Sequence, residues 1–127
     1  MEEQLISFKT AKIAKEKGFY SDKIGFTKQY YNNDGSHIYE GNDENFKIPA
    51  PTQSLLQKWL REIHSINICI SFKPNIKKWD FIPYFMSINQ KEYVAYYINY
   101  FTINNERKYD TYEEALEEGL YQTLLLI

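Results

Sequence analysis

The sequence predicts an α+β domain with a mainly antiparallel sheet and helices packed on one face of it. Two observations carry this prediction: some segments repeat apolar residues at a helical period, and others alternate apolar and polar residues as strands do. The expected order is helix, two strands, helix, three strands, helix. Residues 1–127 are expected to form a single domain, because no repeat or long linker divides the chain.

The first expected helix covers residues 8–17, with Ser7 as its N-cap and Gly18 as its stop. Its apolar face is narrow, and four lysines make the remaining surface basic: Lys9, Lys12, Lys15 and Lys17. These lysines could contact phosphates, although a solvated helix face is the simpler interpretation. They could also lie beside the acidic last helix, within one subunit or across a dimer interface.

A β-hairpin is expected next, with arms at residues 24–31 and 36–40. Its turn, NNDG, contains residues that tolerate a positive φ angle. The following segment GNDENFKIPAP, residues 41–51, is polar and contains two prolines. It is therefore expected to be a connection rather than a strand.

The strongest helical pattern begins at Thr52. Its apolar residues recur at the spacing of one helix side: Leu55, Leu56, Trp59, Leu60 and Ile63. Residues 66–72 then change to a strand period, with one face formed by Ile66, Ile68, Ile70 and Phe72. This face is expected to pack against the helix, and Cys69 is expected to be a small packing residue.

Two further strands are expected, in WDFIPYFMSI (residues 79–88) and EYVAYYINYFTI (residues 92–103). Pro83 lacks a backbone donor, which places the first of them at a sheet edge or a bulge. The second strand has aromatic residues on both faces. The face away from the helices could stack a planar ligand, bind a partner or form a second core layer, and these three alternatives stay open.

The last helix is expected to begin at Thr111, which has the spacing of a capping box with Glu114. Its expected inner face consists of Tyr112, Ala115, Leu116, Gly119, Leu120 and Thr123. The carboxylates of Glu113 and Glu117 have helical spacing, and the simplest interpretation places both on a solvated face.

Composition restricts the classes of function. The net charge of −2 argues against a nonspecific duplex-binding protein, and one cysteine excludes an intrachain disulfide. Aromatic residues make up 17% of the chain, with twelve tyrosines, so some aromatic side chains are expected at a surface or pocket. The first residues do not form a signal peptide, and no apolar run is long enough to span a bilayer. A cytoplasmic protein is therefore expected.

The motifs of catalysis and metal binding are missing. The chain contains no phosphate-binding glycine loop, no dinucleotide fingerprint, no H-E-x-x-H and no nucleophile elbow. His37, His64 and Cys69 do not have a recognised ligand spacing, and the loop NNDGSHIYEGNDE does not fit an EF-hand. We therefore expect no metal, no cofactor and no catalytic residue, and nothing in the sequence indicates an enzyme.

Three phrases carry a resemblance: LISFKTAKIAKEKGF, APTQSLLQKWLREIHSI and TYEEALEEGLYQTLLLI. They resemble uncharacterised short proteins of phages and prophages of Bacteroides-type bacteria, in the same order along the chain. The resemblance implies no activity, cofactor or catalytic residue. It implies a context, which is a small phage-borne protein in the cytoplasm of the host cell.

Three hypotheses for function follow. The first is a non-enzymatic accessory protein that binds a host or phage protein, itself as a homo-oligomer. The second is an anti-defence sponge for a nucleotide-like immune signal, which needs aromatic and cationic side chains in one pocket. Its candidate residues are Arg61, His64, Trp79 and Tyr97. The third is a nucleic-acid-binding regulator that uses the lysines of the first helix, a class that the net charge disfavours.

Overall fold

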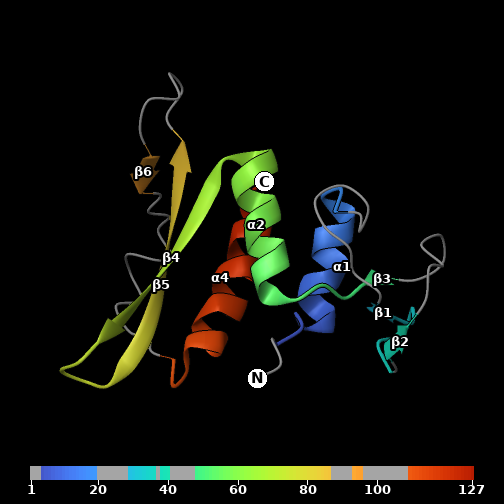
Figure 1. Cartoon of the computed structure of the whole chain (residues 1–127), viewed down its shortest axis with the longest axis horizontal. Coiled ribbons are helices and arrows are strands. Elements are labelled where there is room, and N and C mark those ends of the chain that lie inside the picture. Colours follow the sequence, from blue (N-terminus) through green and yellow to red (C-terminus); the bar gives the residue numbers. More distant parts are fainter. Residues whose placement is uncertain (1–3, 20–28, 37, 41–47, 87–92, 96–108) are drawn as a thin grey trace.

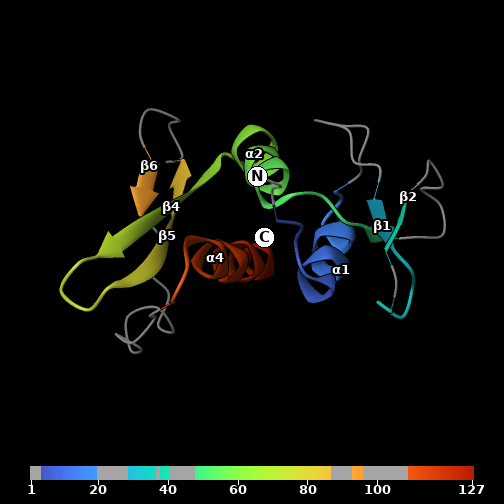
Figure 2. The same cartoon turned by 60° about the horizontal axis from the view of Figure 1, so that its bottom comes forward.

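Three helices lie between two small antiparallel sheets in the part of the chain that this computed structural model describes (Figures 1 and 2). That part consists of residues 4–19, 29–36, 38–40, 48–86, 93–95 and 109–127. The helices are α1 (Phe8–Glu16), α2 (Gln53–His64) and α4 (Tyr112–Leu126). The strands are β1 (Gln29–Tyr31), β2 (Ile38–Glu40), β3 (Ile48–Pro49), β4 (Ile66–Lys73), β5 (Lys78–Met86) and β6 (Tyr93–Ala95). The predicted α+β class is confirmed.

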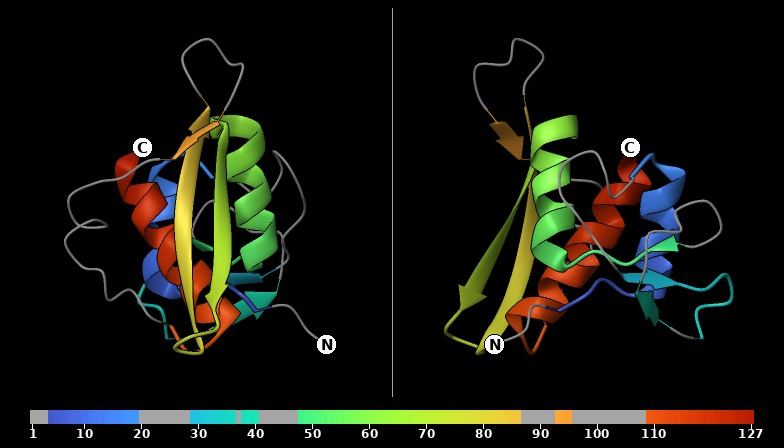
Figure 3. Two further views of the ribbon diagram at one scale, coloured as in Figure 1. Left: turned by 90° about the vertical axis from the view of Figure 1, so that its left-hand side faces the viewer. Right: turned by 45° about the vertical axis from the view of Figure 1, so that its right-hand side comes forward.

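The larger sheet has the strand order β4-β5-β6, and both of its pairs are antiparallel. Helices α2 and α4 cover one of its faces, as predicted (Figure 3). Helix α4 comes very close to the strands at Gly119. A Cβ atom there would lie 3.1 Å from Cγ of Phe81 and 3.2 Å from Cγ2 of Ile68, so the small residue allows this close packing.

Strand β5 lies in the middle of this sheet and pairs residue for residue with β4 through Pro83, so the expected edge or bulge position of this proline is wrong. The orientation of Ile68, which pairs with Pro83, explains why a proline fits there. The Gln57 side chain donates to the carbonyl of Ile68 over 3.0 Å, so the backbone groups of Ile68 point away from β5. The pair is therefore one that exchanges no hydrogen bonds, and β4 does not need the N–H that proline lacks.

The smaller sheet has the strand order β2-β1-β3 and packs beside α1 (Figure 2). The expected hairpin is confirmed over its described residues, with Tyr31 opposite Ile38 and Gly35 at φ 78° in the turn. Strand β3 is a correction, because residues 48–49 pair with β1 inside the segment that was expected to be a connection. Its two residues are too few to produce a periodic pattern in the sequence.

Helix α1 begins and ends as predicted. The hydroxyl of Ser7 accepts a hydrogen bond from Thr10 N over 3.3 Å, and Gly18 has φ 97°. The helix lies beside α4 in the same chain (Figure 2). Lys9 Nζ lies 4.0 Å from the centre of the Tyr121 ring, and Lys17 Nζ donates to the backbone oxygen of Ile127 over 3.1 Å. Two of the lysines thus take part in packing within the subunit.

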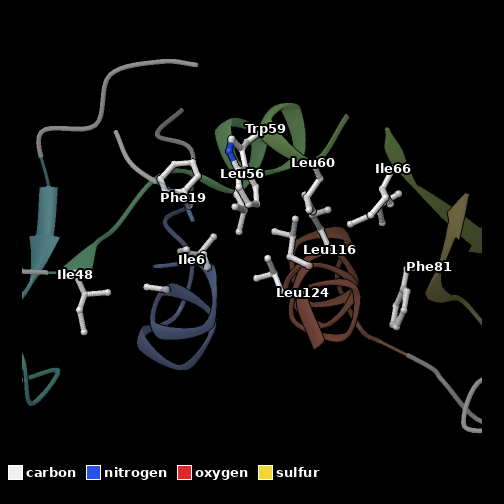
Figure 4. Packing of buried hydrophobic residues seen from close by; sticks show 14 residues of the cluster. Ile6, Phe19, Ile48, Leu56, Trp59, Leu60, Ile66, Phe81, Leu116 and Leu124 are labelled. Atoms are coloured by element: carbon white, nitrogen blue, oxygen red, sulfur yellow. The ribbon is translucent and has the colours of Figure 1, made fainter. Parts of the chain in front are cut away.

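Helix α2 buries Leu56, Trp59 and Leu60 in the core, as predicted (Figure 4). Ile63 is a correction, because 54% of it is exposed in the last turn of the helix. Gln53 is buried instead, although its polarity excluded it from the expected face. The helical period shows which side of the helix faces the core. It does not show where along the helix the neighbouring helices end.

Helix α4 buries most of its predicted face, and Leu124 as well. Glu114 N donates to the Thr111 hydroxyl over 3.1 Å, which confirms the N-cap. The return bond of the capping box differs, because the Glu114 carboxylate accepts from Asp110 N over 3.2 Å. Tyr112 is not buried as expected, since 40% of it is exposed.

The carboxylate of Glu117 joins the three helices. It accepts hydrogen bonds from the backbone N–H and the hydroxyl of Ser7, over 3.1 and 2.9 Å, at the start of α1. It also accepts from the Gln53 side chain of α2 over 3.3 Å. The expectation of a fully solvated Glu117 is therefore wrong, because the ends of two other helices meet α4 at this point.

Several predictions concern residues outside the described part of the chain. Of the expected strand 92–103, the structure describes residues 93–95, which pair with residues 84–86. The alternatives for the second aromatic face stay predictions. Among the described helices none is long and apolar enough to cross a membrane.

Candidate functional site

A cluster of apolar side chains lies at the surface where β4 turns into β5. We call it the tip patch and define it as the ring cluster of Phe72, Trp79 and Tyr112 together with Ile76, an exposed residue of the turn between the two strands. The rings of Phe72 and Trp79 have centres 4.9 Å apart, and the Tyr112 ring stands edge-on to Trp79 at 5.6 Å. Exposed fractions are 46% for Phe72, 41% for Ile76 and 40% for Tyr112. Such clustered exposure is typical of interaction surfaces.

The tip patch continues the face that forms the core further along the same strands. Ile66 and Ile68 are buried, Ile70 is half-buried and Phe72 is exposed, although all four share one side of β4. Toward its tip the hairpin of β4 and β5 leans away from α2 and α4 (Figure 1). The apolar alternation of β4 therefore continues into the part of the strand that the helices do not cover.

The backbone of Tyr109, just before α4, holds the backbone of Trp79 in place. Its N–H donates to the Tyr109 carbonyl over 2.8 Å, and its carbonyl accepts from Tyr109 N over 3.0 Å. Asp110, the next residue, forms an ion pair with Lys78. These contacts connect the hairpin to the start of α4, so the rings are ordered before any partner arrives. Such preorganisation reduces the entropy lost on binding.

Charges of both signs surround the tip patch. Lys73 Nζ lies 3.1 Å from the Asp80 carboxylate, and Lys78 pairs with Asp110. Both acids lie close enough to offset the positive charge of the lysines. The patch therefore has an apolar centre and a rim that carries both signs of charge, and an apolar core with a polar rim is the usual arrangement at a protein–protein interface.

The structure separates the residues that the sequence proposed for a ligand pocket. Arg61 is exposed and His64 half-buried in the last turn of α2, next to the start of β4. Trp79 pairs with Phe72 near the other end of β4, six residues from Ile66, which corresponds to roughly 20 Å. Tyr97 lies outside the described residues. The described candidates are thus not brought together, and Trp79 belongs to the tip patch.

Sequence reasoning missed three members of the tip patch. Phe72 and Tyr112 have the correct period for a buried face, and so they were assigned to the core. Ile76 lies in a turn, where no period applies. The sequence contains no signal that the covering helices diverge from this end of the strand.

His64 packs against the core at the opposite end of β4. Its ring stands edge-on to Trp59 with centres 4.6 Å apart, and its Nε2 atom is buried without a hydrogen-bond partner among the described residues. Ser65, and not the imidazole, caps the C-terminal end of α2. It has φ 57°, and its N–H donates to the Leu60 carbonyl. Burial lowers the pKa of His64 below its ordinary value.

Acidification is expected to destabilise the fold through His64. Because the folded-state pKa lies below the unfolded value of about 6.5, the unfolded chain takes up this proton first as the pH falls. The contribution is complete above about pH 6.5 and is lost as the pH falls through the folded-state pKa. Urea unfolding between pH 7.5 and 5 should show a smaller loss of stability for His64→Gln than for the wild type. Equal losses would contradict the assignment.

A concave region lies between α1 and the smaller sheet. It is an open hollow of about 330 Å³ lined by Lys12, Lys15, Glu16, Asn33 and Ile48. Its polar side chains include both signs of charge, so it does not have the uniformly cationic lining that a phosphate site needs. It contains none of the residues proposed from the sequence.

The described residues contain no group of three His, Cys, Asp or Glu side chains that could hold a metal ion. Cys69 is exposed on β4, so its expected role in packing is wrong. The chain matches no family model, no curated protein and no solved structure. Its function must therefore be inferred from its own surface.

Proposed function

We propose that this chain is a non-enzymatic binding protein that docks on another protein through the tip patch. The observation that carries the proposal is the contact of Phe72, Trp79 and Tyr112 at an exposed hairpin tip. Tryptophan and tyrosine are enriched among the residues that dominate binding energy at protein interfaces. The patch presents both, on a backbone that is already ordered.

The partner is a protein with an apolar anchor that can cover the exposed edges of these rings. The resemblance to phage and prophage proteins supports a host or phage protein as this partner, and the host cytoplasm as the compartment. Both remain part of the proposal.

The other two hypotheses have weaker support. A sponge for a nucleotide-like signal needs cations beside stacking rings, whereas Arg61 and His64 lie far from Trp79, and Lys73 and Lys78 are paired with acids. A nucleic-acid-binding regulator would use the lysines of α1, of which Lys9 and Lys17 contact α4. Neither hypothesis gains a specific observation from the structure.

The test is affinity purification from host lysate with the tagged full-length chain and a double variant, Phe72→Ser with Tyr112→Ser. Both side chains are substantially exposed, so these changes should affect folding little. Losing two interface rings is expected to cost about 2 kcal/mol or more of binding, which corresponds to a loss of about 30-fold in affinity. Quantitative mass spectrometry should show that a protein retained by the wild type is depleted by the variant.

The matched control carries Ile38→Ser and Leu125→Ser, which remove two side chains that are each 48% exposed and lie outside the tip patch. It should retain the same protein as the wild type. Equal retention by all three chains, or equal depletion by both double variants, would contradict docking through the tip patch.

A further inference from the structure

The outer edge of β4 presents backbone groups that lack a partner in the described part of the chain. Strand β4 is an edge strand in the order β4-β5-β6. The carbonyl of Ile68 points away from β5 toward Gln57. Backbone groups alternate in direction along a strand, so those of Ile70 and Phe72 also point outward.

Strand β5 independently shows that the backbone groups of Phe72 point outward. Trp79 pairs with Phe72, and both its N–H and its carbonyl bond Tyr109 on the side away from β4. A pair in which one residue turns both groups away exchanges no hydrogen bonds. Phe72 must therefore also direct its groups away from β5, and among the described residues none bonds those of Ile70 or Phe72 on that side.

The free stretch is short and has defined ends. On one side, Gln57 occupies the Ile68 carbonyl; on the other, Pro74 begins the turn and has no N–H to donate. The tip end of β4 diverges from α2, which leaves this stretch accessible from the helix side (Figure 3). Proteins usually protect such an edge with charges or prolines, whereas β4 carries one charged residue, Lys73.

We propose that this edge pairs with the same edge of a second copy, in an antiparallel register with a two-fold axis at Ser71. In this register Ile70 lies opposite Phe72 of the partner subunit, and the two residues exchange two hydrogen bonds. The two-fold axis generates a second such pair, so the N–H and carbonyl groups of Ile70 and Phe72 are satisfied in both subunits. The pairing ends where Gln57 occupies the Ile68 carbonyl and where the partner subunit's chain turns away at Pro74, which has no donor to offer.

The side chains are also self-complementary in this register. Ile70 meets the ring of the partner subunit's Phe72 on one face, and such pairs of β-branched and aromatic residues stabilise sheets. Lys73 lies opposite Cys69 of the partner subunit, so no like charges face each other. A register centred on Phe72 would leave the Ile70 carbonyl opposite proline without a donor, which is why the axis falls at Ser71. The pairing does not depend on docking through the tip patch.

The register predicts a specific disulfide. Ser71 lies directly opposite its own copy in a pair without mutual hydrogen bonds, with Cα atoms roughly 4.5 Å apart, which suits a disulfide. The full chain carrying Ser71→Cys and Cys69→Ser should form a covalent dimer under mild oxidation, seen by non-reducing electrophoresis. The wild type is the matched control, because its Cys69 residues would lie four residues out of register, roughly 13 Å apart.

A second pair of variants tests the hydrogen bonds. Ile70→Pro removes an outward donor and leaves the β5 ladder intact, so it should yield a folded monomer by light scattering, with unchanged far-ultraviolet circular dichroism. Ser71→Pro removes a donor to β5 and should lower stability instead. The wild type should have about twice the 15.2 kDa chain mass at concentrations near 100 µM.

Three outcomes would overturn the proposal. They are a monomeric wild type at that concentration, a dimer that Ile70→Pro leaves intact, and a Ser71→Cys chain that crosslinks no better than the wild type. A protein captured through the tip patch by a monomeric chain would refute the self-pairing and leave the proposed function standing.

Discussion

Replacing Trp59 with alanine is expected to lower the free energy of unfolding by about 3–5 kcal/mol. Trp59 is 1% exposed at the centre of the core, where the Phe19 ring stands edge-on to it at 5.4 Å (Figure 4). Alanine would leave a large cavity between α2 and its neighbours. Urea denaturation of the purified chain, followed by circular dichroism, measures the change.

Trp59→Phe is the matched control for this prediction. The indole Nε1 atom is buried and has no hydrogen-bond partner among the described residues. Phenylalanine removes this unsatisfied N–H and keeps most of the ring, so the loss of stability should be less than half that of alanine. A near-neutral Trp59→Ala would show that the ring does not support the core.

The helices could be predicted well because their signals are local. Ser7, Thr52 and Thr111 each cap a helix through a side chain that reaches a backbone N–H three residues later. Such a bond depends on sequence spacing alone. The errors at Ile63 and Tyr112 have the opposite origin: both residues have the correct period, but they lie where the neighbouring element ends. That ending is a property of the tertiary structure.

The sheets could be predicted only in part, because strand pairing joins distant segments. The alternation in residues 66–72 identified β4, but nothing in it showed that β1 and β2 belong to a different sheet. Pro83 shows the same limit. Its assignment to an edge followed from the missing N–H, whereas the direction of that missing group depends on the register with Ile68.

The candidate site depended even more on tertiary structure. Trp79 was selected as a candidate ligand-binding residue, and it does lie in a surface cluster. Its neighbours come from β4 and from α4, which is 33 residues further along the chain at Tyr112. The sequence offers no local pattern for a contact of that separation. The outward direction of the Ile70 backbone groups likewise follows only from tertiary contacts. These are the hydrogen bond from Gln57 to Ile68 and the hydrogen bonds between Tyr109 and Trp79.

Replacing Glu117 with alanine is expected to lower the free energy of unfolding by about 2–4 kcal/mol, because it removes an ionised acceptor from several donors at once. Its carboxylate accepts from the N–H and hydroxyl of Ser7 and from the buried Gln53 side chain. Without it, the start of α1 loses an anion placed favourably for the helix dipole. Urea denaturation should detect the loss, and amide hydrogen exchange should show faster exchange in α1.

Glu113→Ala separates this role from a simple change of charge. Glu113 lies one helical turn earlier on α4, and its side chain is exposed. The variant changes the net charge equally, and its cost should stay below about 1 kcal/mol, from the helix dipole. Glu117→Gln should fall between the two, because the amide keeps one acceptor oxygen but turns an N–H toward groups that also donate. Equal effects of Glu113→Ala and Glu117→Ala would mean that net charge, not the junction of three helices, accounts for the loss.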